Sequence, residues 1–353
     1  MNFSNSLIQW YLQNKRDLPW RDTKNPYPIW LSEIMLQQTR VAQGLPYYLS
    51  FTTAFPTVFD LANASEEQVL KLWQGLGYYS RARNLHKTAQ HIAFEKNGVF
   101  PPSYKELLKL KGVGEYTAAA IASFSYDEVV PVVDGNVYRV LSRFFDIETD
   151  ICLSSARKEF SDLALALMPI NNPAIFNQAI MEFGALQCVP KNPDCENCVL
   201  NFGCLALKNK KVSQLPVKSK KVKVKNRYFN YLVFIDENIN TIIQKRTAKG
   251  IWHNLFEFPL IETASTENLD MISAEIQKNN FIENKIISVL LMNMNTEIHK
   301  LTHQHLFINF WEIQVEGAIK DGINYESLMQ YPFPIVIHNF IEREKMSFKN
   351  LYL

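Results

Sequence analysis

Apolar residues recur at three- and four-residue spacing from residue 3 to about residue 207, and short polar connections separate the runs. This spacing puts apolar side chains on one face of an α-helix, so it predicts an all-α segment. The helices that we expect span residues 6–15, 28–49, 66–72, 82–97, 104–110, 116–123, 136–145 and 156–166.

The pattern changes after Arg227. Residues 228–235 and 241–245 are rich in β-branched and aromatic side chains, and the polar residues 236–240 between them predict a hairpin turn. Residues 305–315 predict a further strand, and residues 265–279 predict a helix. We therefore expect an all-α domain at 1–207, a linker at 208–227 and a mixed α/β domain at 228–353.

The net charge of the whole chain is only +2, but basic residues are concentrated in the predicted linker. A solvated linker and a strap that faces DNA both fit such a basic run. Its nine basic residues, with no acidic one among them, are Lys208, Lys210, Lys211, Lys218, Lys220, Lys221, Lys223, Lys225 and Arg227.

Hydropathy argues against a membrane protein. The chain is 47% hydrophobic, which is enough for a large core, but it has no run of about 18 apolar residues and no charged-then-apolar leader at Met1. We expect a cytoplasmic protein without a membrane span.

A tight turn and a carboxylate stand out between residues 107 and 139. Gly112 and Gly114 flank one valine where a short helix ends and an apolar helix begins. Backbone N–H groups at such a helix start, with Lys109 and Lys111 nearby, suit a phosphate oxygen. Taken alone, the glycines also fit a plain bend between helices, and Asp134 fits a plain N-cap.

Four of the five cysteines crowd together as Cys188-x6-Cys195-x2-Cys198-x5-Cys204, and Cys152 stands apart. In a cytosolic chain this clustering favours metal ligation over disulfides. Four thiolates hold either tetrahedral zinc or a [4Fe–4S] cluster, and the number of sulfurs does not distinguish the two.

Taken together, the cysteine spacing, the glycine turn and Asp134 resemble the helix-hairpin-helix DNA glycosylases of the endonuclease III superfamily across residues 1–207. Within it, the chain is most similar to the adenine DNA glycosylase (MutY-type) family, through residues 18–21, 30–39, 75–83 and 133–137. The resemblance implies base excision repair of adenine paired with 8-oxoguanine or guanine in duplex DNA. It also implies a [4Fe–4S] cluster in the loop 188–204, and we expect a monomer that is nucleoid-associated if bacterial.

The resemblance assigns two carboxyl groups to the hydrolysis. Glu33, among apolar neighbours, would donate a proton to adenine, and Asp134 would stabilise or capture the sugar cation, supported by Asn136 and Tyr116. Endonuclease III relatives that cut the backbone carry a lysine at the position of Tyr116. A phenol forms no imine with the sugar, so we expect base removal without an efficient lyase step.

The same resemblance implies the contacts to DNA. Tyr78 would intercalate beside the lesion, with Gln38, Thr39 and Leu76 nearby, because an excised base must leave the stack. Trp20 and Arg21 would line the adenine pocket. The turn at Gly112 and Gly114 would bind phosphate, as would Arg81, Arg83, Lys109 and Lys111.

The C-terminal residues resemble the Nudix-like domain of this family, most closely at residues 250–259. We find no Arg-Glu-x-x-Glu-Glu series after Gly250, so we do not expect nucleotide hydrolysis. The stretch Leu301-Thr302-His303 corresponds to the family's Phe-Ser-His lesion loop, which implies that Thr302 and His303 read 8-oxoguanine. Leu301 cannot stack as phenylalanine would.

Two other functions remain open from the sequence. One is a bifunctional pyrimidine-lesion glycosylase of the endonuclease III type, which Tyr116 and the extra domain disfavour. The other is a non-catalytic iron–sulfur protein that binds damaged DNA. The presence of both Glu33 and Asp134 disfavours this interpretation, since a protein that only binds DNA has no need for both.

Overall fold

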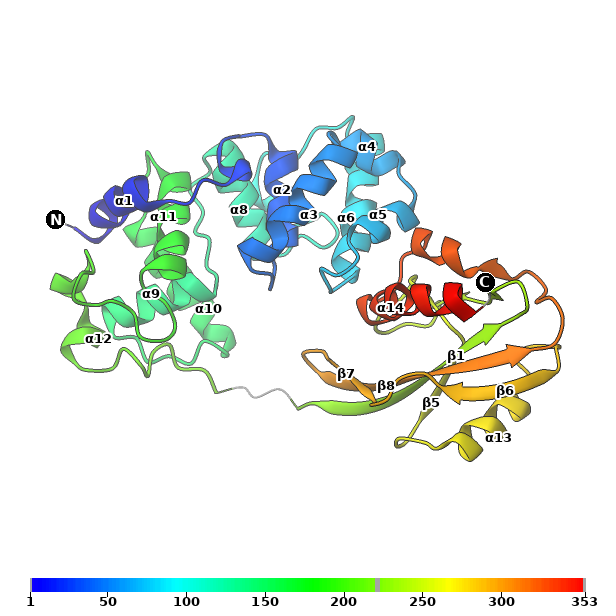
Figure 1. Cartoon of the computed structure of the whole chain (residues 1–353). Helices are drawn as coiled ribbons and strands as arrows, with labels where there is room; N and C mark the ends of the chain where they lie inside the picture. Colours follow the sequence, from blue (N-terminus) through cyan, green and yellow to red (C-terminus); the bar gives the residue numbers. More distant parts are fainter. Residues whose placement is uncertain (1, 220–222, 352–353) are drawn as a thin grey trace. The chain divides into compact units, whose positions relative to one another are not determined.

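The computed structural model describes residues 2–219 and 223–351, which form two compact units (Figure 1). We call them the helical unit, residues 2–63 and 84–219, and the sheet unit, residues 64–83 and 223–351. Residues 64–83 thus group with the C-terminal half, although the sequence pattern assigns them to the N-terminal domain. The limits 1–207, 208–227 and 228–353 remain a prediction.

The described part of the N-terminal half is all-α, as predicted. Its helical elements are α1 (Phe3–Asn14), η1 (Pro19–Arg21), α2 (Pro26–Met35), α3 (Val41–Ala54), α4 (Val58–Asn63), α5 (Glu66–Leu72), α6 (Ser80–Gln90), η2 (His91–Glu95), α7 (Tyr104–Leu107), α8 (Glu115–Tyr126), α9 (Gly135–Phe145), α10 (Ser154–Leu167), α11 (Pro173–Leu186), η3 (Asn201–Gly203) and α12 (Leu205–Lys208). Helix α5 belongs to the sheet unit, and α6 crosses from one unit to the other.

One core of the helical unit lies among α1, α9, α10 and α11. Each helix presents one apolar face to it, which is the source of the sequence periodicity. Its fully buried side chains include Leu7, Val137, Leu141, Phe160 and Phe176.

The expected helix 28–49 is wrong, because the chain turns between α2 and α3. Gln38 adopts a left-handed conformation with φ +58°, and the side chain of Leu36 lies against Gly44. A glutamine rarely takes this conformation, so the composition gave no turn signal. The helices expected at 82–97 and 104–110 are also shorter: a π-helical turn, η2, follows α6, and α7 ends at Leu107.

The sequence pattern also missed α11, although Asn172 and Pro173 are a typical helix start. Its run is apolar on nearly every side because it packs against several helices at once, so it lacks the one-sided periodicity of a surface helix. This helix proves central to the candidate site.

The turn at Gly112 and Gly114 forms as predicted, and α8 begins at Glu115. Gly112 has φ +76°, and a Cβ at this position would come within 2.6 Å of the Asn84 Cβ atom. Thr88 on α6 donates a hydrogen bond of 2.7 Å to the Lys111 carbonyl. Helix α6 therefore supports the turn from behind, while both glycines are exposed.

Residues 209–219 of the predicted linker pack on the segment that follows α9. Asn209 and Lys211 bond to Asp146, Ile151 donates to the Val217 carbonyl, and Ser219 bonds to Asp150. This part of the basic run is therefore not a free linker. Lys220 and Lys221 lie outside the described residues.

The sheet unit is built on a mixed five-stranded sheet with the order β5-β1-β8-β6, in which β7 also pairs with β8. The long strands β1 and β8 run parallel, with Tyr231 opposite Phe310. Its described strands and helices are β1 (Lys225–Ile235), β2 (Asn240–Thr241), β3 (Gln244–Lys245), β4 (Phe256–Glu257), β5 (Leu260–Thr263), α13 (Leu269–Asn279), β6 (Ile286–Leu291), β7 (Glu297–Lys300), β8 (Gln304–Val315), β9 (Ile323–Asn324), η4 (Tyr325–Gln330) and α14 (Ile335–Leu351).

Helices cover both faces of this sheet. Leu232 and Ile313 pack with Ile272 of α13 on one face, whereas Phe310 stacks on Phe340 of α14 on the other, with ring centroids 3.8 Å apart. Neighbouring residues of a strand point to opposite faces, which explains why both long strands are nearly continuous in apolar residues.

The predicted hairpin between 228–235 and 241–245 is wrong. A turn does form at 236–240, around the Asp236 carboxylate, but β1 pairs with β5 and β8. The segment 241–245 splits into β2, which pairs with β9, and β3, which pairs with β4. The long partner β8 offers β1 far more backbone hydrogen bonds than a local hairpin could.

Residues 64–83 are attached to the rest of the sheet unit by several polar contacts. Lys245 pairs with Glu67, Arg83 donates to the His253 carbonyl at 2.7 Å, and Lys71 donates to the Tyr331 carbonyl at 3.2 Å. None of these contacts follows from local sequence.

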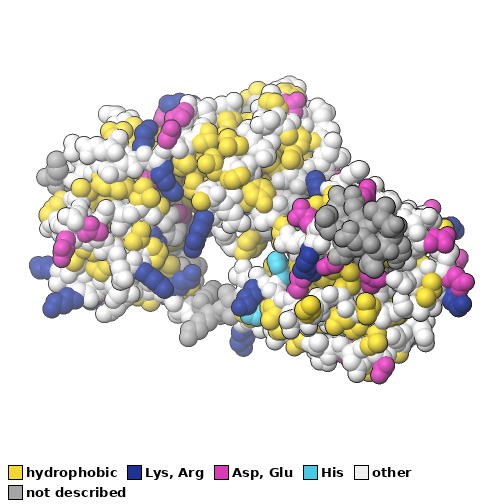
Figure 2. Space-filling model, viewed as in Figure 1, with side chains coloured by type: hydrophobic (Ala, Val, Ile, Leu, Met, Phe, Trp, Pro, Cys, Tyr) yellow, Lys and Arg dark blue, Asp and Glu magenta, His cyan; other side chains and the backbone are white. Residues whose placement is uncertain are grey.

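The visible surface carries both signs of charge. On the face in Figure 2, Lys and Arg side chains are interspersed with Asp and Glu and with hydrophobic areas. None of the helices within the described ranges is long and apolar enough to cross a membrane.

Candidate functional site

Glu33 lies in α2 and is buried, with 8% of its surface exposed. Burial, together with the nearby Asp134 charge, raises the pKa of Glu33 to about 7, although the Tyr116 hydroxyl and Arg21 oppose the rise. A carboxyl group with this pKa is partly protonated near neutral pH, so it can act as an acid there.

Asp134 is the N-cap of α9. One of its carboxylate oxygens accepts hydrogen bonds of 2.8 Å from the backbone N–H groups of Asn136 and Val137, and the other accepts one of 2.8 Å from the Asn136 side chain. Burial raises the pKa of Asp134, and these three bonds oppose the rise. Aspartate is a favoured N-cap, so the local sequence positions this carboxylate.

Tyr116 brings these two acids into one cluster. It lies in the first turn of α8, its hydroxyl bonds to Glu33, and burial with both neighbouring carboxyl groups raises its pKa well above the usual range. Its hydroxyl also lies 3.5 Å from the Met181 sulfur in α11. Four segments far apart in sequence thus meet around Tyr116.

Asn136 connects the cluster to the cysteine loop through Arg139. The Arg139 guanidinium donates to the Asn136 side chain at 2.8 Å, to the Gly184 carbonyl at 2.6 Å and to the Cys188 carbonyl at 2.7 Å. A Cβ on Gly184 would lie 2.6 Å from the Asn136 Cβ atom. A glycine at 184 is therefore required for α9 to approach α11 this closely.

Glu182 is a residue of this region that the sequence analysis missed. It lies in α11, its side chain is 1% exposed, and it forms bidentate ion pairs with Arg16 and Arg21. Burial alone would raise its pKa, but the hydrogen bonds from Arg16 and Arg21 hold the pKa at about 2. A glutamate inside the apolar run 179–184 was the available sequence signal.

The predicted contacts to DNA fall into two groups. The first group lies in the helical unit and consists of Trp20, Arg21, Gln38, Thr39, Gly112 and Gly114. Gln38 and Thr39 lie in the turn between α2 and α3, and Trp20 is buried with its ring against Tyr48. Leu76, Tyr78, Thr302 and His303 belong to the sheet unit, where Leu76 is buried and the other three are exposed.

Tyr78 and Thr302 meet in the sheet unit, 224 positions apart in sequence. Their hydroxyl oxygens are 2.6 Å apart. Tyr78 has φ +49° and lies beside Gly77, whose φ is +77°. Tyr78 and Thr302 line a pocket of about 480 Å³, which is also lined by Trp252, Leu301 and His303.

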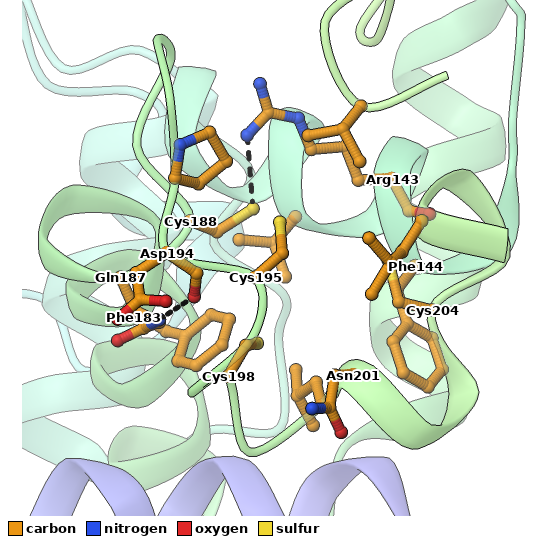
Figure 3. A pocket seen from close by; sticks show the side chains of 15 residues that line it. Arg143, Phe144, Phe183, Gln187, Cys188, Asp194, Cys195, Cys198, Asn201 and Cys204 are labelled. Carbon is orange, nitrogen blue, oxygen red and sulfur yellow. Dashed lines mark hydrogen bonds between the residues drawn. The ribbon is translucent and has the colours of Figure 1, made fainter. Parts of the chain in front are cut away.

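The four clustered cysteines line one pocket at the end of α11 (Figure 3). Cys188 follows α11, Cys204 caps α12, and Cys195 and Cys198 lie in the loop between them. Arg143 lies beside this loop: its guanidinium is 3.4 Å from the Cys188 sulfur and donates to the Val189 and Pro190 carbonyls.

Comparisons with known proteins agree with this arrangement. Residues 31–164 match the HhH-GPD superfamily of base excision DNA repair proteins, and residues 230–343 match the NUDIX domain. An adenine DNA glycosylase of Buchnera aphidicola (subsp. Schizaphis graminum) is 40% identical over 262 residues, 74% of this chain and 75% of the relative. Another from Buchnera aphidicola (subsp. Baizongia pistaciae) is 39% identical over 310 residues, 87% of this chain and 84% of that one.

The chain belongs to the adenine DNA glycosylase family. Its fold also resembles a solved thermostable thymine-DNA glycosylase, with a TM-score of 0.55 and 29% identity over 59% of this chain and 95% of that one. The helical architecture is therefore shared with DNA glycosylases that act on other bases.

The cysteine pocket of this family member suits a thiolate-bound group in its donor set. All four thiols are free of disulfides and half-buried. Burial raises the pKa of Cys198 to about 11, so thiolates here need a positively charged partner. Among residues 2–219 and 223–351, no three His, Cys, Asp or Glu side chains lie close enough together to hold a metal ion.

Replacing Glu182 should destabilise the helical unit. We expect Glu182→Gln to lower the free energy of unfolding by about 3 kcal/mol, because it leaves two arginines without their counter-charge. Urea unfolding followed by circular dichroism measures this. Asp127→Asn is the matched control: it removes the exposed Lys24–Asp127 pair and should cost less than about 1 kcal/mol.

The pH dependence of this effect has a defined sign. The pKa of Glu182 falls from 4.5 to about 2 on folding, so its stabilisation is complete above 4.5 and is lost as the pH falls through about 2. The difference between wild type and Glu182→Gln should shrink over this range. A difference that is equal at pH 7 and pH 2 would contradict the assignment.

Proposed function

We propose that this adenine DNA glycosylase acts as a monomer on duplex DNA and hydrolyses the N-glycosidic bond of adenine paired with 8-oxoguanine or guanine. The observation that carries the proposal is the pair of buried carboxyl groups, Glu33 and Asp134, in unequal environments. Cleaving adenine from its sugar requires a proton on the base and negative charge beside the developing oxocarbenium ion.

The two environments support two different roles. Glu33 is buried with one hydroxyl partner, so its neutral form is favoured, and it can donate a proton to adenine N7. Asp134 accepts three hydrogen bonds at the N-terminus of α9, all of which favour its anion. The anion would stabilise or capture the sugar cation.

Tyr116 supports a monofunctional reaction. Its hydroxyl is held by Glu33 and Met181, and a phenol cannot form the imine on which a lyase step depends. The Tyr116 hydrogen bond would keep the Glu33 proton directed into the site, and Asn136 would keep Asp134 in place. The product would be an intact strand with an abasic site.

The remaining helical-unit residues suit duplex binding. The Gly112–Gly114 turn, whose two glycines are exposed, would bind phosphate on one strand through backbone N–H groups, with Lys109 and Lys111. Gln38 and Thr39 lie in the turn after α2, the helix that carries Glu33, so they would contact the extruded nucleotide, and Trp20 and Arg21 would border the adenine.

A single-turnover assay tests the reaction and its acid. We expect adenine opposite 8-oxoguanine to be released at a rate that falls about tenfold per pH unit above pH 7, because the pKa of Glu33 is about 7 and only its protonated form donates. Glu33→Gln and Asp134→Asn should each lower the rate at least about 10³-fold. Strand breaks should appear only after alkali treatment.

Two results would oppose this mechanism. Binding of the duplex without release of adenine would mean a non-catalytic damage-binding protein. Strand cleavage without alkali, with a borohydride-trapped adduct, would mean a lyase step.

The pocket around Tyr78 and Thr302 supports reading of the base opposite adenine. Its aromatic and hydroxyl groups can stack on a purine and bond to its polar edge. Leu301 occupies the place of the family's phenylalanine, so Thr302 and His303 would supply most of the loop's recognition.

We expect Thr302→Ala with His303→Ala to reduce the preference for 8-oxoguanine over guanine by about tenfold, because one or two hydrogen bonds are lost. The ratio of single-turnover rates on the two duplexes measures it. Ser288→Ala, on the exposed part of β6, is the control. An unchanged ratio in the double variant would remove these residues from recognition.

Cys188, Cys195, Cys198 and Cys204 would hold a [4Fe–4S] cluster, which when bound would cross-link the loop that leads to α12. Arg139 joins that loop to Asn136 and so to the carboxyl pair.

Purified protein should therefore contain about four iron and four sulfide per chain and show the visible absorbance of an iron–sulfur cluster. Cys198→Ala should lose most of this iron, because three ligands remain. Cys152→Ala, outside the pocket, is the matched control and should retain it. About one zinc per chain and no visible absorbance would contradict the assignment.

A further inference from the structure

Asn177 is a buried polar residue of α11 to which the mechanism above gives no task. It is 1% exposed, and α11 packs against both α8 and α9 (Figure 1). Its amide makes hydrogen bonds of 2.9 Å to the Ser123 hydroxyl, 2.9 Å to the Val130 carbonyl and 3.0 Å from the Val132 N–H. Each of these partners lies at least 45 positions away in sequence.

The segment that Asn177 holds leads directly to Asp134. The described residues 128–133 are in neither a helix nor a strand, so their backbone groups lack the regular partners of a helix or sheet. Pro131, in the middle, has no N–H to donate. One side chain therefore satisfies the carbonyl before Pro131 and the N–H after it.

The hydrogen bonds of Asn177 also connect the segment before Asp134 to another part of the carboxyl cluster. Ser123, which accepts from the same amide, lies in α8, the helix that carries Tyr116. The bonds of Asp134 to Asn136 and Val137 tie it to α9 only. Asn177 thus supplies a connection between the chain entering Asp134 and the helix carrying Tyr116.

We propose that Asn177 is a positioning residue that holds Asp134 at its working distance from Tyr116 and Glu33. The inference rests on the proposed function, since it concerns the rate of adenine release. Asn177 does not touch the reacting atoms and acts through the backbone of Val130 and Val132. Displacement of a reacting group by about 1 Å lowers rates by up to about 100-fold.

A purely structural role would act differently. Loss of three buried hydrogen bonds lowers stability in any case, so stability does not distinguish the two roles. A displaced Asp134 slows the chemical step while the surfaces that bind phosphate stay intact. The informative quantities are the maximal single-turnover rate and the enzyme concentration that gives half of it.

The experiment compares wild type with Asn177→Ala, Asn177→Asp and Ser123→Ala on duplex with adenine opposite 8-oxoguanine, below the unfolding temperature of each variant. Asn230→Ala is the matched control, because Asn230 is a 2% exposed amide with hydrogen bonds to Ile261, Thr263 and Trp311 in the sheet unit. It should lose comparable stability.

We expect Asn177→Ala to lower the maximal rate by between about 10-fold and 100-fold with the half-saturating concentration within about twofold of wild type. Ser123→Ala removes the hydroxyl that accepts one hydrogen bond from the Asn177 amide and changes the core volume little. It should lower the maximal rate by about threefold. Asn177→Asp keeps the acceptor for Val132 and should recover part of the rate. Asn230→Ala should keep the wild-type rate.

The proposal fails if both Asn177→Ala and Ser123→Ala release adenine at the wild-type maximal rate. It also fails if the rate falls equally in Asn230→Ala, or if DNA binding weakens in proportion to the rate. Absence of adenine release by the wild type would instead refute the proposed function, so the two failures are distinct.

Discussion

Two carboxyl groups buried within electrostatic reach of each other constrain this molecule most. The Asp134 charge raises the cost of ionising Glu33, and unequal hydrogen bonding of the two carboxyl groups keeps their protonation states apart. Asp134 has a helix start and an asparagine to hold its charge, whereas Glu33 has a tyrosine hydroxyl. The same burial that separates their protonation states also requires a rigid surrounding frame, since entry of water would reduce the desolvation on which the shift depends.

Helix α11 provides much of that frame. Asn177 faces the segment before Asp134, Met181 faces Tyr116, Glu182 anchors Arg16 and Arg21, and Gly184 admits α9. These four residues lie within about two turns of one helix, so α11 sets the positions of their partner residues relative to one another. Because Cys188 lies just after the end of α11, the cysteine loop and the carboxyl pair share a support.

The sheet unit rests on a different constraint, the parallel pairing of β1 with β8. Aromatic residues on one face pack under α14, and aliphatic residues together with Phe234 and Trp311 on the other pack under α13. The sheet carries the loop that contains Thr302, and the segment 64–83 brings Tyr78 to the same pocket. The two residues are 224 positions apart in sequence, so the pocket forms only when both the sheet and this segment are folded.

The sequence by itself determined the features set by a few consecutive residues: the Gly112–Gly114 turn, the Asp134 cap, the cysteine spacing and the helical period of the first half. Each follows from local backbone preferences and side-chain spacing. Only the tertiary structure decided that Gln38 breaks a helix, that β1 pairs with β8 rather than with its neighbour, and that Glu182 and Asn177 support the site. These choices depend on partners far along the chain, where packing and buried hydrogen bonds outweigh local preference.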